Sequence, residues 1–283
     1  MKYNFTDDKI VILDKTEFNS THILECGQIF RYKKISEKEY QVFSDKYSAK
    51  IIENEDNYTI TSKNLKYFEN FFDLSNDYSQ IKKSLSAQNE TLKKAIEFAG
   101  GIRILNQPPL EMIISFIISS NNNIKRIQLL VDRLCTKCGT DMGDYFAFPT
   151  LEQLSTLSLE DLKEMGMGFR AKYIYNTVNA LKGVDLEALR NLSSYDRLNF
   201  FTTLNGVGEK VADCISLFAY HDMFCFPVDT WVEKIYNSYF ADGNIEKDRK
   251  LIRKKLTDKF SNLSGYAQQY LFYYKRELDK KHI

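Results

Sequence analysis

The period of the hydrophobic residues changes once along this chain, near Asn64, and this change limits the folds that the chain can adopt. The first ~65 residues contain short segments rich in β-branched and aromatic residues, which predict strands: "KIVILD", "EYQVF", "AKIIEN" and "NYTITS". After Asn64 the apolar residues recur at helical spacing, first in "NLKYFENFFDL" and "ETLKKAIEFAGG". Strands followed by helices indicate an α+β fold with a small N-terminal antiparallel sheet and a larger, all-helical part.

Two of the four prolines stand in "ILNQPPL" (104–110), which is typical of a connection between domains. We therefore expect an N-terminal antiparallel β domain with flanking helices at 1–100 and a helical domain at 101–283, with a helical hairpin at about 196–220. Within the second domain the spacing predicts these helices: 110–118, 122–135, 151–164, 171–182, 194–203, 209–220, 229–240, 248–260 and 265–279.

The net charge of the 283 residues is only +1, so the chain lacks the strongly basic balance that is typical of nucleic-acid binders. This does not exclude DNA, because helix N-termini and glycine turns bind phosphate through backbone N–H groups. No apolar run approaches the ~20 residues of a membrane span, and "MKYNFTDDKIVILD" contains no signal-peptide core. We expect a cytoplasmic protein with no membrane partner.

The cysteines and histidines do not form a recognisable catalytic or metal-binding pattern. Cys135 and Cys138 form one CxxC, but a zinc site needs four ligands and no second pair stands nearby. A redox or zinc role stays open, and two free thiols at a helix end are the favoured interpretation. We therefore expect no metal site and no histidine-based chemistry; the histidines are His22, His221 and His282.

The sequence "LNGVGEKVADC" places Gly206 and Gly208 directly before Lys210, at the start of a predicted helix. Two glycines allow a tight turn and a close approach to bare amide groups, and such a turn before a helix can hold an anion. On this helix Val211, Ile215 and Phe218 form the core stripe, and Lys210 lies beside it.

Burial and the helix dipole lower the pKa of a lysine at this position, whereas a bound phosphate raises it. The direction of the net shift stays open. It matters for function, because only a neutral amine can attack carbon. A surface lysine beside a helical hairpin is the alternative interpretation.

Asp229 in "FPVDTW" follows Pro227 and precedes a helix expected to start near Thr230. An aspartate there is a good N-cap, and the backbone N–H bonds that it accepts favour its ionised form. Asp229 either only caps the helix or also stabilises a positive charge that develops on a sugar carbon.

These residues together resemble the helix-hairpin-helix, glycine/proline-rich loop and aspartate signature (HhH-GPD) of DNA glycosylases. Four further segments are similar to the 8-oxoguanine DNA glycosylase/AP lyase branch: "CGQIFRY" (26–32), "FIISSNNNIKRI" (116–127), "GMGFRAKYI" (166–174) and "GYAQQYLF" (265–272). The resemblance implies a TBP-like N-terminal domain and an enzyme of DNA base excision repair. Such an enzyme flips 8-oxoguanine out of duplex DNA, excises it through a lysine Schiff base and nicks the strand by β-elimination.

The resemblance also implies the roles of single residues. Lys210 matches the catalytic amine and Asp229 the catalytic aspartate. The residues matched to binding of the 8-oxoguanine base are Gly27, whose carbonyl accepts the N7 hydrogen, Cys214 and Phe272, which sandwich the base, Gln268 at its Watson–Crick edge, and Pro227. The residues matched to DNA and the estranged cytosine are Asn121, Arg126, Phe169, Arg170, Gly206 and Gly208.

The implied partner is duplex DNA with 8-oxoguanine opposite cytosine, bound by a monomer that needs no cofactor, although a monovalent ion can bind at the hairpin carbonyls. The chain departs from vertebrate members at Phe169, where they carry tyrosine, and at Trp231, where they carry histidine. It also lacks the iron–sulfur cysteine cluster of endonuclease III-type relatives. Two alternatives stay open: a glycosylase for another damaged or mismatched base, and a non-catalytic helix-hairpin-helix module that binds DNA.

Overall fold

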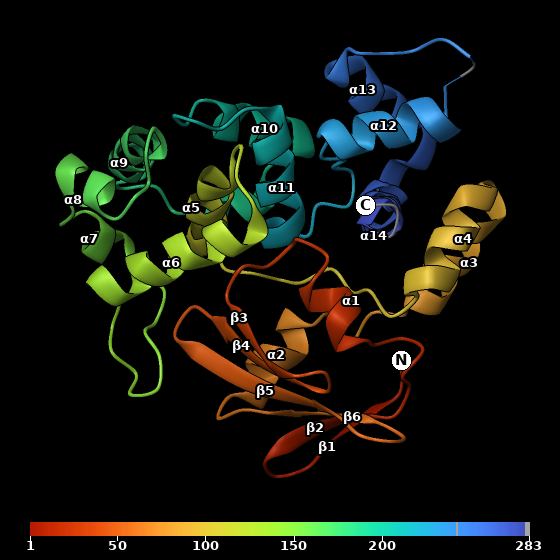
Figure 1. Ribbon diagram of the computed structural model, residues 1–283, viewed down its shortest axis with the longest axis horizontal. Coiled ribbons are helices and arrows are strands. Elements are labelled where there is room, and N and C mark those ends of the chain that lie inside the picture. Colours follow the sequence, from red (N-terminus) through yellow and green to blue (C-terminus); the bar gives the residue numbers. More distant parts are fainter. Residues whose placement is uncertain (242, 281–283) are drawn as a thin grey trace.

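The computed structural model describes residues 1–241 and 243–280 of the chain, so His282 and the last residues of the predicted helical domain lie outside this part. An antiparallel sheet formed by the N-terminal residues lies on one side of the molecule, and a group of helices lies on the other (Figure 1). The predicted α+β fold is confirmed.

The sheet has the strand order β1-β2-β6-β5-β4-β3, and every neighbouring pair is antiparallel. The register aligns Ile10 with Ile60, Ile60 with Ile51 and Ile51 with Tyr40, so one row of fully buried side chains crosses four strands. The strands are β1 (Tyr3–Phe5), β2 (Lys9–Ile12), β3 (Tyr32–Ser36), β4 (Glu39–Ser44), β5 (Tyr47–Glu53) and β6 (Tyr58–Thr61).

Strands β1 and β3 are absent from our sequence predictions. Both form edges of the sheet, and neither contains a buried residue, so neither shows the apolar alternation that marks β2 or β4. Their β structure comes from pairing with a neighbour rather than from burial of their own side chains.

The helices of the described residues mostly lie at the predicted positions. They are α1 (Ser20–Leu24), α2 (Leu65–Phe71), α3 (Tyr78–Gln88), α4 (Glu90–Ala99), α5 (Pro109–Ser119), α6 (Ile124–Cys138), α7 (Leu151–Leu154), α8 (Leu159–Glu164), α9 (Arg170–Ala180), α10 (Ser194–Thr202), α11 (Glu209–Tyr220), α12 (Thr230–Tyr239), α13 (Arg249–Phe260) and α14 (Ser264–Lys280). The short helices α1 and α3 have no counterpart in the predictions.

The single helix predicted at 151–164 is wrong, because the chain forms the two helices α7 and α8 there. Thr150 and Ser158 each start a helix through a complete capping box, in which Gln153 and Asp161 are the partners. The second capping box lies inside the predicted helix and stops its continuation.

Helix α11 is the centre of the helical part, and its residues from Val211 to Tyr220 are all buried. Helices α5 and α10 pack against it. The ring of Phe218 stacks on Phe116 of α5, with centroids 5.6 Å apart. The predicted core stripe of Val211, Ile215 and Phe218 is therefore buried, but so is the opposite face, which carries Cys214.

Helices α3 and α4 pack together, and α4 lies beside α14 (Figure 1). Tyr78, Leu85 and Leu92 belong to the same hydrophobic cluster as the core of the helical part, whereas Leu74 belongs to the cluster under the sheet. The two clusters thus divide the chain between Leu74 and Tyr78, with three exceptions. Cys26 and Phe30 belong to the helical cluster, and Leu105 belongs to the cluster under the sheet.

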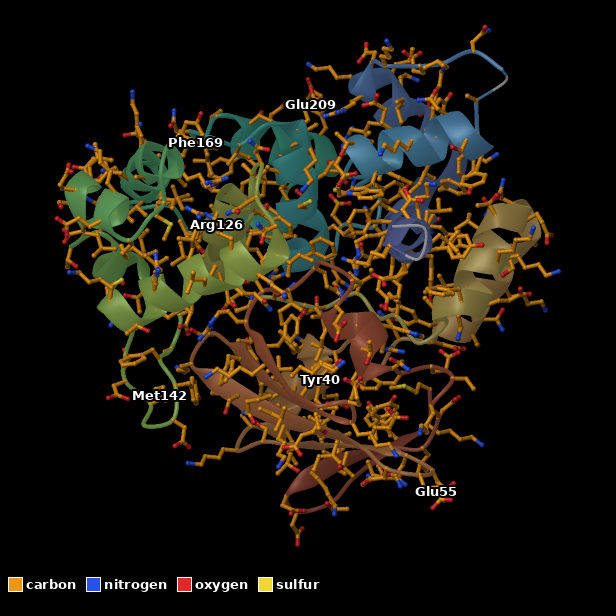
Figure 2. All side chains as sticks on the ribbon, viewed as in Figure 1. Tyr40, Glu55, Arg126, Met142, Phe169 and Glu209 are labelled. Carbon is orange, nitrogen blue, oxygen red and sulfur yellow. The ribbon has the colours of Figure 1, made fainter. Side chains whose placement is uncertain are left out.

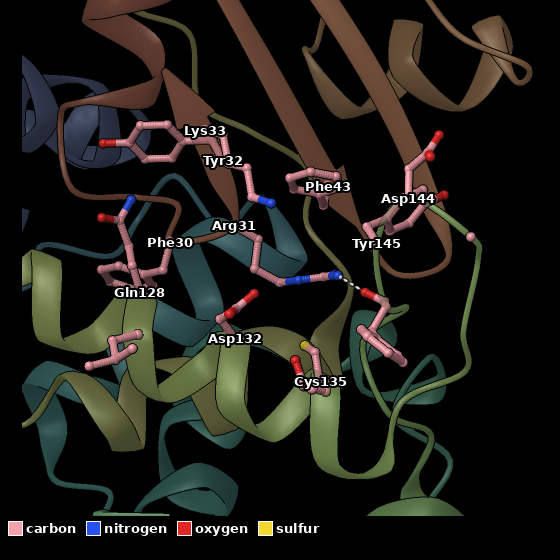
Figure 3. Close-up of a pocket in the computed structure, with 14 residues that line it drawn as sticks. Phe30, Arg31, Tyr32, Lys33, Phe43, Gln128, Asp132, Cys135, Asp144 and Tyr145 are labelled. Atoms are coloured by element: carbon pink, nitrogen blue, oxygen red, sulfur yellow. Dashed lines mark hydrogen bonds between the residues drawn. The ribbon is translucent and has the colours of Figure 1, made fainter. Parts of the chain in front are cut away.

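An ion pair of Arg31 and Glu111 joins the two parts, with 3.3 Å between Nη1 and Oε2. The same carboxylate accepts the backbone N–H of Asp45, and Arg31 Nη2 donates to the carbonyl of Phe146 at 2.7 Å (Figure 3). Burial raises the pKa of the Glu111 carboxyl in spite of Arg31. Beside this pair lies a cavity of about 450 Å³, lined by β3, β4, α6 and the loop before α7.

Arg103, directly before the segment predicted as a connection, has no exposed surface. Its guanidinium lies 4.0 Å from the Tyr78 ring centroid and donates to four backbone carbonyls, those of Glu17, Phe72, Asp73 and Asn76. Arg103 therefore contacts residues of both hydrophobic clusters, Phe72 under the sheet and Tyr78 in the helical part.

We expect Arg103→Met to lower the free energy of unfolding by about 3–5 kcal/mol, because it leaves buried carbonyls without donors. Urea denaturation of the purified protein measures this loss. The control Lys66→Met removes an exposed cation that pairs with Glu69 at 2.9 Å, and we expect a change below about 0.5 kcal/mol. Equal losses for both variants would show that Arg103 adds no special stability.

Candidate active site

A cleft of about 960 Å³ opens where the α5–α6 loop, the first turns of α11 and α12, and the last turns of α14 approach one another. Five residues predicted from the sequence line it: Gly27, Asn121, Lys210, Asp229 and Phe272. Lys210 and Asp229 therefore share one cavity, although they start different helices.

Lys210 stands in the first turn of α11, and its Nζ lies 5.6 Å from the ring centroid of Phe116. Burial lowers the pKa of this amine, but Cys214 and Asp229 raise it, and the result is a pKa above the ordinary value of lysine. Burial also raises the pKa of the Cys214 thiol to about 11. The direction of the pKa shift of Lys210, which the sequence left open, is therefore upward in the free protein.

Asp229 is the N-cap of α12, as predicted. Its Oδ1 accepts the backbone N–H groups of Trp231 and Val232, both at 2.9 Å. Both capping bonds end on the same oxygen, so the cap does not use Oδ2. The residue can therefore cap the helix and place negative charge in the cleft at the same time.

The turn before Lys210 needs glycine at one of its two glycine positions. Gly206 has φ +83°, and a Cβ there would lie 2.5 Å from the ring of Tyr173, so both conformation and space exclude a side chain. Gly208 has an ordinary φ of −92° and open space around it, and it forms the N-cap of α11 without a side chain. The amide groups at this helix start are therefore open to an approaching anion.

The residues matched to base binding lie at the cleft or directly behind it. Gly27, with φ +87°, meets Phe272 across the cleft wall, since a Cβ on Gly27 would lie 3.5 Å from Phe272 Cε1. Cys214, Pro227 and Gln268 are buried outside the set that lines the cleft. Among the described residues, the buried Gln268 Oε1 has no hydrogen-bond partner, so it is available to a ligand.

The residues matched to the estranged base gather on the other side of the cleft. Asn121 is exposed with φ +49°, a left-handed conformation that is uncommon outside glycine. Arg170 donates to the carbonyls of Ser120 and Asn121 at 2.6–2.9 Å and thus holds this loop. Burial and the charge of Arg126 lower the pKa of Arg170, so the two guanidinium groups are close together.

Phe169, the predicted wedge, is 53% exposed, and the Arg170 guanidinium lies 4.4 Å from its ring centroid. Figure 2 shows Phe169 and Arg126 on the helical part of the molecule, away from the sheet. Single exposed apolar side chains are common on protein surfaces, so the exposure of Phe169 permits a role as a wedge but does not by itself indicate one.

Most residues that line the cleft have no role in our sequence predictions, and Phe30, Phe116, Arg249 and Arg276 are among them. The two phenylalanines stand in quoted family motifs and pack edge to face, 5.5 Å between centroids, as ordinary core residues do. The two arginines stand in charged helical segments, where a side chain is usually solvated, and no local signal marks them.

Among the described residues, no group of three histidine, cysteine or acidic residues is close enough to hold a metal ion. Cys135 and Cys138 are free, and burial raises the pKa of their thiols to about 12 and about 11. Thiols with such pKa values are poor nucleophiles at neutral pH, which disfavours a redox role. In the same part of the chain, no helix has both the length and the apolar composition that membrane crossing requires.

Two family models match adjacent parts of the chain. The model described as "8-oxoguanine DNA glycosylase, N-terminal domain" matches residues 10–113, and the model described as "HhH-GPD superfamily base excision DNA repair protein" matches residues 114–262.

Curated proteins named as N-glycosylase/DNA lyases are similar in sequence. The Arabidopsis thaliana protein, named OGG1, is 38% identical over 188 residues, which cover 61% of this chain and 51% of the relative. The Methanothermobacter thermautotrophicus protein, a "probable" member by name, is 30% identical over 74% of this chain and 73% of its own length. The chain spans about half the length of the Arabidopsis and Saccharomyces cerevisiae relatives that it matches.

Solved structures agree over nearly the whole chain. The 8-oxoguanine glycosylase/lyase of Clostridium acetobutylicum, in complex with double-stranded DNA containing cytosine opposite 8-oxoguanine, has a TM-score of 0.91 and 35% identity, with 99% of both chains covered. The 3-methyladenine DNA glycosylase of Archaeoglobus fulgidus, at 16% identity and a TM-score of 0.73 over 98% of this chain and 99% of its own, shares the fold alone.

The two roles of Asp229 can be separated. We expect Asp229→Ala to lower the free energy of unfolding by about 1 kcal/mol, and Asp229→Asn by less than about 0.5 kcal/mol, because asparagine caps a helix as well as aspartate does. Both variants remove the anion and should lower the pKa of Lys210. The pH dependence of reductive methylation at Lys210, followed by mass spectrometry, measures this shift. An unchanged pH profile would show that Asp229 does not affect the pKa of Lys210.

Proposed function

Since the chain belongs to the 8-oxoguanine DNA glycosylase branch of the HhH-GPD superfamily of base excision DNA repair proteins, we propose that it excises 8-oxoguanine from duplex DNA and then nicks the strand. The observation that supports this most strongly is the shared cleft of Lys210 and Asp229. A DNA-binding module without catalysis would not need a buried amine and a carboxylate in one cavity beside Gly27 and Phe272.

The damaged nucleotide first leaves the duplex, because a stacked base cannot reach an internal cleft; unstacking costs a few kcal/mol. The exposed Phe169 is the side chain proposed to wedge into the duplex, and Asn121, which lines the cleft, is proposed to fill the vacated space. The open amides at Gly208 hold a phosphate of the same strand.

Excision requires Lys210 to lose its proton, because the raised pKa keeps the amine charged in the free protein. The neutral Nζ then forms a bond to C1′ of the deoxyribose while the bond from C1′ to the base breaks. The departing base takes the electron pair of that bond, and the proton that the newly bonded Nζ releases neutralises it. The Asp229 carboxylate stabilises the positive charge that develops on the sugar.

The covalent amine opens the sugar ring and becomes a Schiff base between Nζ and C1′. The iminium nitrogen withdraws electrons, so a proton can leave C2′ and the 3′ phosphate is expelled by β-elimination. Hydrolysis of the Schiff base returns the free lysine. These steps need no metal or redox cofactor. We also propose that a monovalent ion can bind at the backbone carbonyls of the hairpin, although it takes no part in these steps.

Selection of 8-oxoguanine is proposed to depend on the backbone carbonyl of Gly27. The lesion carries a hydrogen on N7 that guanine lacks, so a carbonyl facing N7 accepts a hydrogen bond from the lesion and meets a lone pair on guanine. A site built around such a bond rejects an analogue that cannot make it. The positive φ of Gly27 supports this role, because it turns the backbone of this segment toward Phe272.

The proposed partner is duplex DNA with cytosine opposite the lesion, bound by a monomer, in the cytoplasm if the source is prokaryotic. Arg126 and Arg170 are the residues proposed to contact that cytosine. Because Arg170 already donates to the carbonyls of Ser120 and Asn121, binding of cytosine must exchange some of these bonds.

Lys210→Gln tests the nucleophile. We expect the wild-type protein to form a covalent adduct with an 8-oxoguanine:cytosine duplex in borohydride, and the variant to form none while binding DNA within about threefold of wild type. Gel separation of trapped adducts and a binding titration provide the two readouts. As the control, Lys254→Gln removes an exposed lysine paired with Asp258 and should trap normally. Trapping by the Lys210 variant would disprove the assigned role.

Arg126→Gln tests recognition of the opposite base. We expect wild-type excision to be fastest when cytosine stands opposite 8-oxoguanine, and the variant to lose about tenfold of that preference, because one guanidinium contact to a base is removed. Single-turnover rates on four duplexes, one for each opposite base, measure it. An identical preference in both proteins would leave Arg126 without a part in specificity.

A further inference from the structure

Arg276 lies in the wall of the proposed base pocket, one helical turn after Phe272 on α14. It is 7% exposed, and none of the matched family motifs contains it. The guanidinium is buried beside Gly27 and Phe272, and the steps proposed above give it no role. Any part that it plays in base binding rests on the proposed function.

Arg276 is the one arginine of the described residues with a fully buried guanidinium nitrogen that has no hydrogen-bond partner. Arg103 and Arg197 are also buried, and in each of them Nε, Nη1 and Nη2 all donate to protein acceptors. Arg276 Nη1 is buried and has no partner among the described residues. Because a buried N–H without an acceptor is unfavourable, its presence at a cleft points to an acceptor on a ligand.

The remaining contacts of Arg276 join the two walls of the base pocket. Nη2 donates to the backbone carbonyl of Glu25, two residues before Gly27, and Nε and Nη2 both donate to Glu277 Oε1 at 3.0–3.1 Å. The guanidinium carbon lies 5.6 Å from the ring centroid of Phe272, within cation–π distance. One side chain thus holds the Gly27 segment and contacts the ring on which the base is proposed to stack.

The free donor lies where these two walls meet. Nη1 and Phe272 Cε1 are both 3.5 Å from the position that a Cβ on Gly27 would occupy. On 8-oxoguanine, the N7–H group is flanked by the carbonyl oxygens at C6 and C8. The Gly27 carbonyl can accept a hydrogen bond from N7–H. The Arg276 Nη1 N–H beside it can then donate to one of the two flanking carbonyl oxygens, at C6 or at C8.

We propose that Arg276 is a specificity-determining residue: it holds the Glu25–Gly27 segment against Phe272 and presents its free Nη1 N–H to a carbonyl oxygen of the bound base. Its effect is confined to steps in which a base occupies the pocket. Cleavage at a preformed abasic site, which uses Lys210 without a base in the pocket, does not depend on it.

Two substitutions test the proposal. Arg276→Met keeps the aliphatic packing but removes every donor, and Arg276→Lys keeps one donor that can reach Glu25. The matched control is Lys275→Met, which removes the same charge from the same helix turn, where Lys275 pairs with Asp279 at 2.8 Å. The readouts are single-turnover excision from an 8-oxoguanine:cytosine duplex, strand cleavage at an abasic site opposite cytosine, and thermal unfolding.

We expect Arg276→Met to slow excision about 10- to 100-fold, Arg276→Lys to slow it less, and both to cleave the abasic duplex within about threefold of wild type. The control should match wild type in both assays. Excision equal to the control, or a parallel loss of both activities with a lower unfolding temperature, would overturn the proposal and leave Arg276 a structural residue. A wild-type protein that does not excise 8-oxoguanine would refute the proposed function itself.

Discussion

An amine and a carboxylate at the starts of two different helices meet in one cleft, and the chemistry proposed for this protein depends on that meeting. Asp229 lies at the cap of α12 and acts on the pKa of Lys210 at the start of α11. The same carboxylate that would stabilise a cationic sugar therefore keeps the nucleophile protonated in the free protein. Binding of substrate has to reverse this balance, and a positive charge on the sugar that attracts Asp229 away from the amine acts in that direction.

The architecture around this pair explains how it is held. Helix α11 is buried along nearly its whole length, so its first turn cannot shift without disturbing the core. The glycine turn before it packs on Tyr173, where a side chain at Gly206 would collide. The segment between α1 and β3, which carries Gly27, contributes the opposite wall. The ion pair of Arg31 with Glu111 joins the N-terminal part to α5, and Arg103 donates to carbonyls near the ends of α2 and α3. A rigid frame of this kind suits the proposed selection of 8-oxoguanine over guanine, which depends on one hydrogen atom.

Much of the fold follows from local sequence signals. The alternation in β2 and β4, the apolar spacing of α11 and the aspartate cap at Asp229 act over a few residues, so the sequence alone predicts them. The signals fail where structure is imposed from outside the segment. Strands β1 and β3 exist because a neighbour pairs with them, and the second capping box at Ser158 divides a pattern that otherwise predicts one helix.

For the candidate site, local sequence patterns predict which residues carry the proposed chemistry: a lysine after a glycine turn, an aspartate that caps a helix, and a family pattern that includes Gly27 and Phe272. Packing of distant segments places these residues in one cleft, raises the pKa of Lys210 and brings Arg276 to the same cleft wall. Glu25 and Arg276 stand 251 residues apart, and nothing near either of them in the chain marks the contact. The physical reason is that burial and charge depend on which distant segments pack together, whereas turns and caps depend on neighbours in the chain.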